Sequence, residues 1–294
     1  YIVENGESFY LHAGESVPIE NYEVPRVHHN YKETSDDKAD WDRLMNAIAN
    51  GISSGEMTKV VSSREVEFTS ETPYNVASIL ANLVDNNPNC FIFGYEKDGR
   101  TFVGASPEIL VRHRGSEILS YALAGTAPKD GPNGWTKEQL LTNTKNIVEH
   151  NIVRDRIVNT MKQITPHVMV GETGIMELSH LYHLRTIITA KDSTKSLVEW
   201  AKLLHPTPAL GGEPREKALA LLQEYESHER GMYAAPFGFM KDMGDGIVVV
   251  AIRSALIMDN VLYAYAGCGV VADSDAYEEY AETNNKMRTI LDAL

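Results

Sequence analysis

Short apolar runs separated by tight turns dominate the middle and the end of this chain. Between residues 90 and 128, "CFIFGYEK" and "RTFVGAS" flank Asp98-Gly99, while "EILVRH" and "SEILSYALAG" flank a turn at Gly115. Two more pairs of runs turn at "MGDG" and "MDN". Asp-Gly between apolar runs is typical of a β-hairpin. The pattern therefore predicts a meander of about four antiparallel strands, followed later by two further hairpins.

Helical segments separate these clusters of strands. Apolar spacing predicts a helix over residues 37–54, and Thr72 and Pro73 suit the N-cap and first position of a second helix. A long helix is predicted over 137–163, two shorter ones flank "HPTPALGGEP", and a last one covers 275–294. Clustered strands and clustered helices favour an α+β fold with large, mostly antiparallel sheets. We expect one large domain, because no segment resembles a linker.

The charge balance narrows the classes of partner. The 294 residues carry a net charge of -14, which argues against a nucleic acid or an anionic membrane. Cys90 and Cys268 lie far apart, so we expect small buried side chains in a reducing cytoplasm rather than a disulfide framework. No apolar run reaches transmembrane length, and no signal-peptide pattern opens the chain. The sequence predicts a cytoplasmic protein, which we expect to be a monomer.

One apolar run contains an arginine. "GIVVVAIRSALIM", residues 246–258, has the composition of one buried strand, with Arg253 inside it. A guanidinium stays charged and is costly to bury unless an anion meets it. We expect that anion to be either a ligand or a buried carboxylate of the protein, and the run alone favours neither.

Carboxylates on two predicted helices form a candidate metal site. Glu279 and Glu282 share one face of the last helix with Lys286, and Glu149 lies beside the apolar stripe of the long helix. Each by itself is better explained as part of a solvated or paired surface. Together the three carboxylates are a plausible oxygen-only site for Mg²⁺.

Four further residues can be interpreted either as purely structural or as part of a functional site. Lys59 at the start of a strand is usually just solvated, but a buried lysine can act as a general base. Glu108, between two strands, is an ordinary turn residue or an acid. Gly267 and Gly269 in "YAGCGVV" allow a ligand to approach the backbone, or they mark a bulge.

Ten segments, in order, resemble the chorismate-utilising enzymes from about residue 40 to the end. The segments are "KVVSSRE", "GASPEILVR", "ALAGTA", "NIVEH", "YHLRT", "HPTPALGGEPRE", "ERGMYAAPFGF", "AIRSAL", "YAGCGVV" and "EEYAETNNKM". This family includes isochorismate, salicylate, anthranilate and aminodeoxychorismate synthases. The resemblance implies a sandwich of large antiparallel sheets around a central site. It also implies that residues 1–36 are the remnant of a longer N-terminal region and that residues 37–294 form the catalytic domain.

The resemblance assigns roles at the site. Lys59 resembles the lysine that activates water for attack at C2 of chorismate, and Glu108 resembles the acid that protonates the leaving C4 hydroxyl. Arg253 resembles the arginine that grips the enolpyruvyl carboxylate. The remaining substrate-binding positions that it implies are His183, Ala209, Leu210, Tyr233, Gly267, Gly269 and Lys286. Glu149, Glu279 and Glu282 resemble the ligands of a Mg²⁺ that bridges the protein to the ring carboxylate.

Three positions bear on which member of the family this is. Lys59 stands where anthranilate synthases usually carry Gln, and Ala124 stands where aminodeoxychorismate synthases typically carry a nucleophilic Lys. Ala209 stands where salicylate synthases tend to carry Thr. The resemblance is greatest to isochorismate synthases of menaquinone biosynthesis. The alternatives are a salicylate synthase, which also eliminates pyruvate, and a non-catalytic chorismate-binding relative.

Two departures from the family pattern accompany these matches. Asn146 replaces an acid that many relatives carry near the metal helix, so the outer shell of the metal is expected to differ. Ala235-Pro236 replaces a Gly often found after the tyrosine, which implies a stiffer backbone there. Neither departure removes a proposed catalytic group.

Overall fold

The computed structural model describes residues 24–294, apart from 131, 133, 242 and 243, and also the backbone of three short strands nearer the N-terminus. These strands, β1 (Ile2–Glu4), β2 (Glu7–His12) and β3 (Glu15–Pro18), form a small sheet in that order. Other calls on residues 1–23, and Met243 of the predicted "MGDG" turn, lie outside the described residues. The boundary expected at residue 36 stays a prediction.

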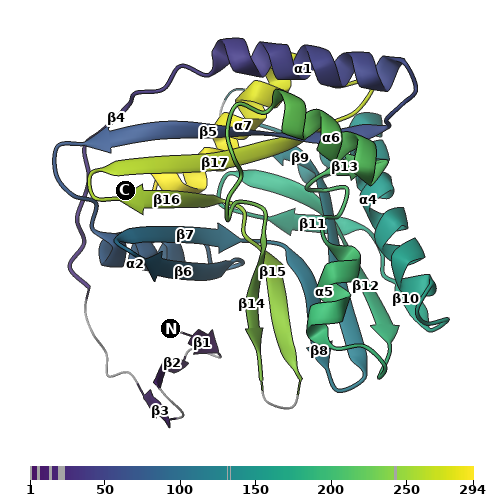
Figure 1. The fold of residues 1–294 in the computed structure, drawn as a ribbon, viewed down its shortest axis with the longest axis horizontal. Coiled ribbons are helices and arrows are strands. Elements are labelled where there is room, and N and C mark those ends of the chain that lie inside the picture. Colours follow the sequence, from purple (N-terminus) through teal and green to yellow (C-terminus); the bar gives the residue numbers. More distant parts are fainter. Residues whose placement is uncertain are drawn as a thin grey trace.

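Two larger sheets of antiparallel strands carry the fold (Figure 1). The first sheet has the order β13 (Gly212–Glu213), β5 (Lys59–Ser70), β17 (Val261–Val270), β16 (Ser254–Met258), β7 (Arg100–Ser106) and β6 (Phe91–Lys97), and β4 (Tyr31–Glu33) also pairs with β5. The second has the order β10 (Val168–Val170), β12 (Leu181–Lys191), β9 (Glu117–Pro128), β8 (Ile109–Arg114), β15 (Gly246–Val250) and β14 (Pro236–Met240), and β11 (Gly174–Glu177) also pairs with β12. The predicted α+β class is confirmed.

At two adjacent points a strand of one sheet is followed almost directly by a strand of the other. Between β7 and β8 the chain passes through Pro107 and Glu108, and between β15 and β16 through residues 251–253. Two backbone hydrogen bonds join these segments. Ala105 N donates to Arg253 O at 3.0 Å, and Val250 N donates to Glu108 O at 3.1 Å. Glu108 and Arg253 therefore lie at one corner between the sheets.

Two predictions about strands were wrong at this corner. The predicted four-strand meander is divided, with β6 and β7 in the first sheet and β8 and β9 in the second. The run 246–258 is likewise two strands, because Arg253 has a left-handed backbone (φ 52°) that a continuing strand does not accommodate. Apolar composition indicates burial, but it does not tell one long strand from two short ones.

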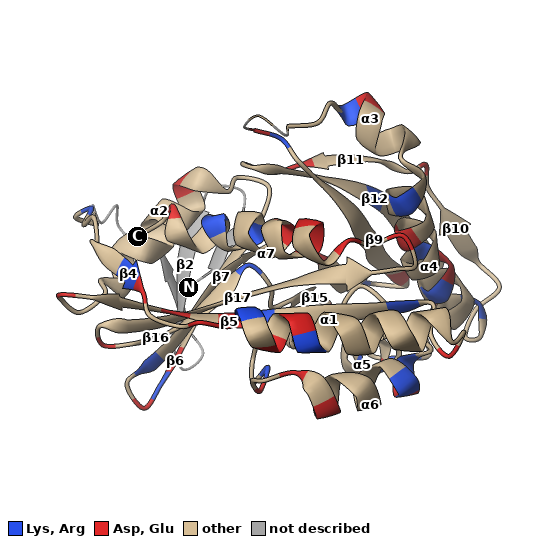
Figure 2. Ribbon diagram, turned by 90° about the horizontal axis from the view of Figure 1, so that it is seen from above, with Lys and Arg blue, Asp and Glu red and all other residues tan. Residues whose placement is uncertain are grey.

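Seven helices in the described part of the chain cover the sheets. They are α1 (Lys38–Ser53), α2 (Val76–Asn86), α3 (Lys137–Thr142), α4 (Thr144–Lys162), α5 (Leu197–Leu204), α6 (Arg215–Tyr225) and α7 (Ala276–Leu291). Helices α1 and α6 pack on β5, α4 packs on β9 and β12, and α7 contacts both β17 and β9. Helix α7 therefore reaches both sheets (Figures 1 and 2). None of the described helices is both long and apolar enough to cross a membrane.

Two predicted helix boundaries were wrong because asparagines provide better caps. The second helix begins at Val76 rather than near Thr72, since the Asn75 side chain accepts from Ser78 N. The predicted helix over 137–163 is broken at Asn143, whose extended backbone ends α3 and whose side chain caps α4 by accepting from Asn146 N. The other predicted helices form close to their expected bounds.

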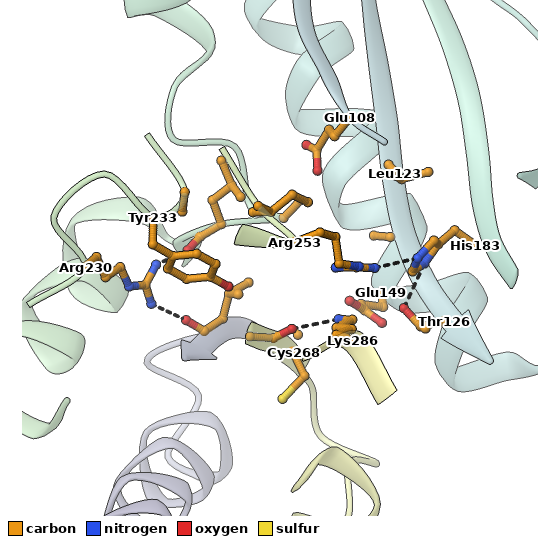
Figure 3. Close-up of a pocket in the computed structure, with 18 residues that line it drawn as sticks. Glu108, Leu123, Thr126, Glu149, His183, Arg230, Tyr233, Arg253, Cys268 and Lys286 are labelled. Carbon is orange, nitrogen blue, oxygen red and sulfur yellow. Dashed lines mark hydrogen bonds between the residues drawn. The ribbon is translucent and has the colours of Figure 1, made fainter. Parts of the chain in front are cut away.

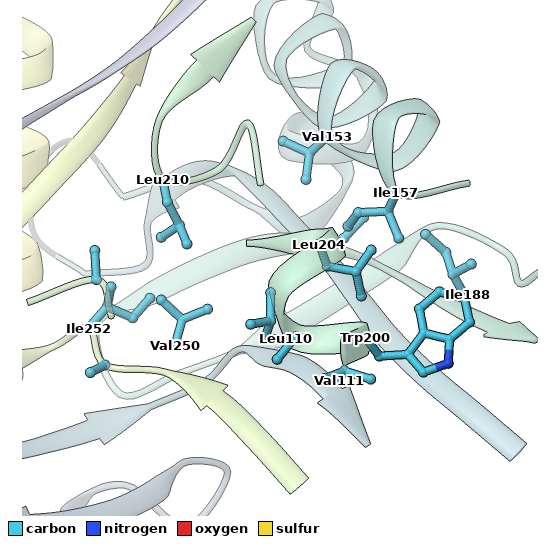
Figure 4. Packing of buried hydrophobic residues seen from close by; sticks show 14 of the residues in the cluster. Leu110, Val111, Val153, Ile157, Ile188, Trp200, Leu204, Leu210, Val250 and Ile252 are labelled. Atoms are coloured by element: carbon cyan, nitrogen blue, oxygen red, sulfur yellow. The ribbon is translucent and has the colours of Figure 1, made fainter. Parts of the chain in front are cut away.

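A cluster of buried apolar side chains supports the second sheet. Trp200 of α5 belongs to it, together with Ile157 of α4 and Ile188 of β12 (Figure 4). Trp200 is fully buried and its indole N–H donates to Asp192 at 2.9 Å, so truncation to Ala would cost about 3–5 kcal/mol. The same cluster includes Ile252, next to Arg253, so the corner between the sheets is packed on a rigid base.

Candidate active site

A cavity lies at the corner between the sheets (Figure 3). The space between its walls, open mouth included, is about 550 Å³. Ten of the thirteen predicted site residues line it: Glu108, Glu149, His183, Ala209, Leu210, Tyr233, Arg253, Gly267, Gly269 and Lys286. Lys59, Glu279 and Glu282 are outside the lining, and their positions are given below.

Arg253 projects into this cavity without a carboxylate partner. Its side chain is buried, and Nη2 lies 2.7 Å from Nε2 of His183 (Figure 3). Its Nε is buried and has no hydrogen-bond acceptor within the described residues. None of the ion pairs between described residues involves Arg253, so the alternative of a buried pair with a protein acid has no support there. Arg253 thus lines the cavity with a buried guanidinium N–H that has no acceptor among the described residues.

His183 of β12 holds the guanidinium. Burial, together with the charges of Arg253 and Lys286, keeps the pKa of His183 well below 6.5, so the ring is neutral. Because Nε2 accepts from Arg253, Nδ1 carries the proton and donates to Thr126 Oγ1 at 3.0 Å. Thr126 and His183 therefore form a chain of hydrogen bonds that orients Arg253.

Glu108 is a buried carboxyl group that keeps its proton at neutral pH. Its side chain is 2 % exposed, and Oε1 has no hydrogen-bond partner among the described residues. Burial raises the pKa of Glu108 to about 8, against the opposing charges of Lys59, Arg253 and Lys286. Glu108 is therefore mostly protonated at neutral pH and can donate a proton into the cavity.

Lys59 begins β5 and lies behind the cavity wall. Its side chain is fully buried, and Nζ is 3.0 Å from Glu149 Oε1 without the angle of a hydrogen bond. A Cβ on Gly269 would lie 2.1 Å from Glu149 Oε1 and 2.7 Å from Lys59 Cε. Only glycine at 269 therefore leaves room for this pair. Lys59 is therefore separated from the cavity by Glu149 and Gly269, both of which line it.

The other predicted glycine also permits a close contact. A Cβ on Gly267 would lie 2.5 Å from Ser62 O and 2.8 Å from the Tyr233 hydroxyl. Lys286 donates to Gly267 O at 2.7 Å, which fixes its ammonium at the cavity wall. Tyr233 is stacked on Tyr265 with ring centroids 5.5 Å apart. Backbone and side chains from three separate segments therefore define one wall.

The three predicted metal carboxylates are each paired with a lysine. Glu149 lies 3.0 Å from Lys59, Glu279 lies 2.5 Å from Lys145, and Glu282 lies 2.6 Å from Lys286. Burial and the charge of Glu282 raise the pKa of Glu279 to about 7. Within the described ranges, no three acidic, His or Cys side chains are gathered as a ready-made metal cluster. The oxygen donors suit Mg²⁺, but the lysines hold them in the arrangement seen here.

Sequence reasoning missed two groups at the site. Arg230 is a cavity-lining residue whose guanidinium donates to Leu210 O at 2.6 Å, to Val61 O at 2.7 Å and to the Glu226 carboxylate. It ties the loop that carries Ala209 and Leu210 to β5. Lys145 was missed as the partner of Glu279. Arg230 lies within "ERGMYAAPFGF" and Lys145 directly precedes "NIVEH", but local sequence does not reveal contacts so distant along the chain.

Comparison with known proteins identifies the family. Residues 12–294 match the family model described as "Chorismate binding enzyme". The chain belongs to the chorismate-binding enzymes. It is 36% identical over 264 residues to isochorismate synthase MenF of Bacillus subtilis, an alignment that covers 88% of this chain and 56% of that protein. The chain thus spans little more than half the length of this relative.

Solved structures of the family share the fold. The menaquinone-specific isochorismate synthase MenF of Escherichia coli superposes with a TM-score of 0.82 at 29% identity, covering 93% of this chain and 66% of that one. Anthranilate synthase component I of Streptococcus pneumoniae superposes with a TM-score of 0.77 at 25% identity, covering 92% and 61%. The fold is common to enzymes that differ in product, so the product must be argued from the site.

Proposed function

We propose that this chain carries the active site of an isochorismate synthase. The reaction would add water at C2 of chorismate and release the C4 hydroxyl with migration of the double bonds. The observation that supports it best is the pair Lys59 and Glu108. Both side chains are buried: Glu108 lines the cavity at the corner between the sheets and is mostly protonated at neutral pH, and Lys59 lies directly behind the cavity wall in the first sheet.

Binding would use the charges around the cavity. Chorismate carries two carboxylates, and the guanidinium of Arg253 has a free Nε–H and a side held by His183. A guanidinium fork suits a carboxylate, so Arg253 would bind the enolpyruvyl carboxylate beside Tyr233 and Lys286. The loop with Ala209 and Leu210, held by Arg230, would cover the side chain of the substrate.

The chemical steps would use one base and one acid. Lys59, in its neutral amine form, would take a proton from water as the C2–O bond forms. Glu108 would give its proton to the C4 oxygen as that C–O bond breaks, and water would leave. One water is consumed and one released, so the product is an isomer of the substrate. A carboxyl that is protonated at the operating pH is the required donor.

Mg²⁺ fits the oxygen donors of Glu149, Glu279 and Glu282, which would hold it. When bound, this ion would supply positive charge to the ring carboxylate of the substrate. The chain presents Glu149 of α4 at the cavity wall, with Lys59 directly beside it, and carries Glu279 and Glu282 on α7.

The menaquinone branch is the proposed setting, because the Bacillus and Escherichia relatives are named MenF. We also propose that the protein acts in the cytoplasm as a monomer. Salicylate synthase is the second candidate. Ala209 at the cavity wall, where salicylate synthases tend to carry Thr, is the position that separates the two readings.

A product assay tests the proposal. The protein is incubated with chorismate and Mg²⁺, and isochorismate, salicylate, anthranilate and pyruvate are separated by chromatography. Isochorismate alone is the expected result. Salicylate with pyruvate would contradict the interpretation of Ala209. Absence of turnover by the folded protein would contradict the proposed activity.

A further inference from the structure

Three lysines neutralise the three candidate metal carboxylates. The pairs are Lys59 with Glu149, Lys145 with Glu279 and Lys286 with Glu282. The charges of the three carboxylates are therefore balanced by those of the three lysines before any metal ion binds. A divalent cation that binds the carboxylates would be repelled by the three ammonium groups. At least one lysine would therefore have to move away from its carboxylate.

Lys145 connects the two helices that carry the carboxylates. It precedes Glu149 by one turn of α4, so the two side chains share one face of that helix. Its Nζ lies 2.5 Å from Glu279 Oε1 on α7. Burial by itself would lower the pKa of Lys145, yet the charges of Glu279, Glu282 and Glu149 raise it. One ammonium thus interacts with all three carboxylates.

Lys145 is also the lysine that can leave. The side chain of Lys59 is 0 % exposed and lies behind Gly269, and the side chain of Lys286 is 10 % exposed and also held by Gly267 O. The side chain of Lys145 is 21 % exposed. Among the described residues, its ammonium makes one hydrogen bond, to Glu279. Rotation of Lys145 toward solvent would break that single bond.

We propose that Lys145 is the displaceable counter-cation of the carboxylate site: its ammonium neutralises Glu279 in the metal-free protein, and a divalent cation binds by replacing it. This inference rests on the proposed Mg²⁺ site. It means that Lys145 competes with Mg²⁺, so the affinity for Mg²⁺ is lower than the carboxylates alone would give.

The first test follows Lys145 in the unaltered protein. Surface lysines are acetylated briefly at constant pH with and without Mg²⁺, and modification is quantified by peptide mass spectrometry. We expect acetylation of Lys145 to rise at least about threefold with Mg²⁺, because the freed amine reaches solvent. Lys162, exposed on the same helix, is the internal control and should not change. Unchanged or lower labelling of Lys145 under saturating Mg²⁺ would overturn the proposal.

The second test measures Mg²⁺ binding by calorimetry without substrate. Lys145→Gln should bind Mg²⁺ about tenfold more tightly than the unaltered protein, since a charge-assisted hydrogen bond no longer has to be broken. Lys162→Gln is the matched control and should bind as the unaltered protein does. Equal or weaker binding by folded Lys145→Gln would show that Lys145 supports the site instead of competing for it.

The two proposals fail in different ways. If the unaltered protein binds no Mg²⁺, or if Glu282→Gln leaves Mg²⁺ binding unchanged, the metal site itself is wrong and the counter-cation proposal is overturned with it. If Mg²⁺ binds through Glu282 but Lys145 shows neither effect, the counter-cation proposal alone is overturned.

Discussion

The guanidinium of Arg253 lies 2.7 Å from Nε2 of His183, and this contact requires the imidazole to be neutral. Burial and the charges of Arg253 and Lys286 lower the pKa of His183 accordingly. A proton on Nε2 would place two donors against each other. We therefore expect His183 to act as a positioning residue that holds the buried guanidinium of Arg253 in place.

His183→Ala should loosen Arg253 and weaken substrate binding. We expect KM for chorismate to rise about tenfold or more, with a smaller effect on kcat, because a hydrogen bond to a charged group is lost. Thr126→Val removes only the acceptor that fixes the tautomer, so it should change KM in the same direction by less. Steady-state kinetics measures both. A large loss of kcat with unchanged KM would contradict the positioning role.

The pH dependence of activity should follow Glu108. Burial raises its pKa from 4.5 to about 8, and the protonated form is the one that donates. We expect kcat/KM to fall about tenfold per pH unit above pH 8, measured from initial rates in buffers of constant ionic strength. Glu108→Gln should lose at least about 100-fold in kcat. A rate that stays level to pH 9.5 would rule out Glu108 as the acid.

The pH dependence of the protein's stability should also reflect the ionisation of Glu108. Because the folded pKa of Glu108 lies above its unfolded value, its contribution is fully present below pH 4.5 and is lost as pH rises through about 8. Glu108→Gln cannot ionise, so it should lose less Tm between pH 5 and 9 than the unaltered protein. Parallel Tm profiles for the two proteins would contradict the raised pKa.

Lys59→Ala tests the base. We expect turnover to fall at least about 100-fold while chorismate still raises Tm in the presence of Mg²⁺, because Arg253 and the carboxylates remain. Enzyme assays and thermal unfolding are compared on the same preparation. Substantial remaining turnover would remove Lys59 from the mechanism.

Local sequence predicted the elements with clear turns and periodicity. Asp98-Gly99 gave the hairpin of β6 and β7, and the apolar spacing over 37–54 gave α1. It missed the passage between sheets at Arg253, because a left-handed residue in an apolar run leaves no compositional trace. It also missed the break at Asn143, since asparagine is tolerated inside helices and only the structure shows its side chain capping α4.

Most of the predicted site residues line one cavity, but the ion pairs among them were not predicted. Ten ordered segments indicated the family, and most of the residues they named line one cavity. The partners of those residues were out of reach, because Lys145 and Glu279 are 134 positions apart and meet only when α4 and α7 pack together. Arg230 was missed for the same reason, since its acceptors on Val61 and Leu210 are set by the tertiary fold.

Gly269→Ala tests the space behind the cavity wall. The added Cβ would collide with Glu149 Oε1 and approach Lys59 Cε, so the pair must separate or β17 must shift. We expect at least a tenfold loss of kcat and a lower Tm. Gly174→Ala is a matched control, because nothing lies within 4 Å of its added Cβ and its backbone is not left-handed. Equal behaviour of the two variants would show that the Lys59–Glu149 contact is dispensable.

Glu282→Gln tests the metal role of α7. The amide keeps the size of the side chain but removes its charge, so we expect the Mg²⁺ concentration for half-maximal activity to rise about tenfold or more. Glu278→Gln on the same helix is exposed and should respond to Mg²⁺ as the unaltered protein does. Titration of initial rates with Mg²⁺ measures both variants. The removal of charge also leaves Lys286 without its ion-pair partner, but its bond to Gly267 O remains, so chorismate binding should be less affected than Mg²⁺ binding. An unchanged Mg²⁺ response would place this face of α7 outside the metal site.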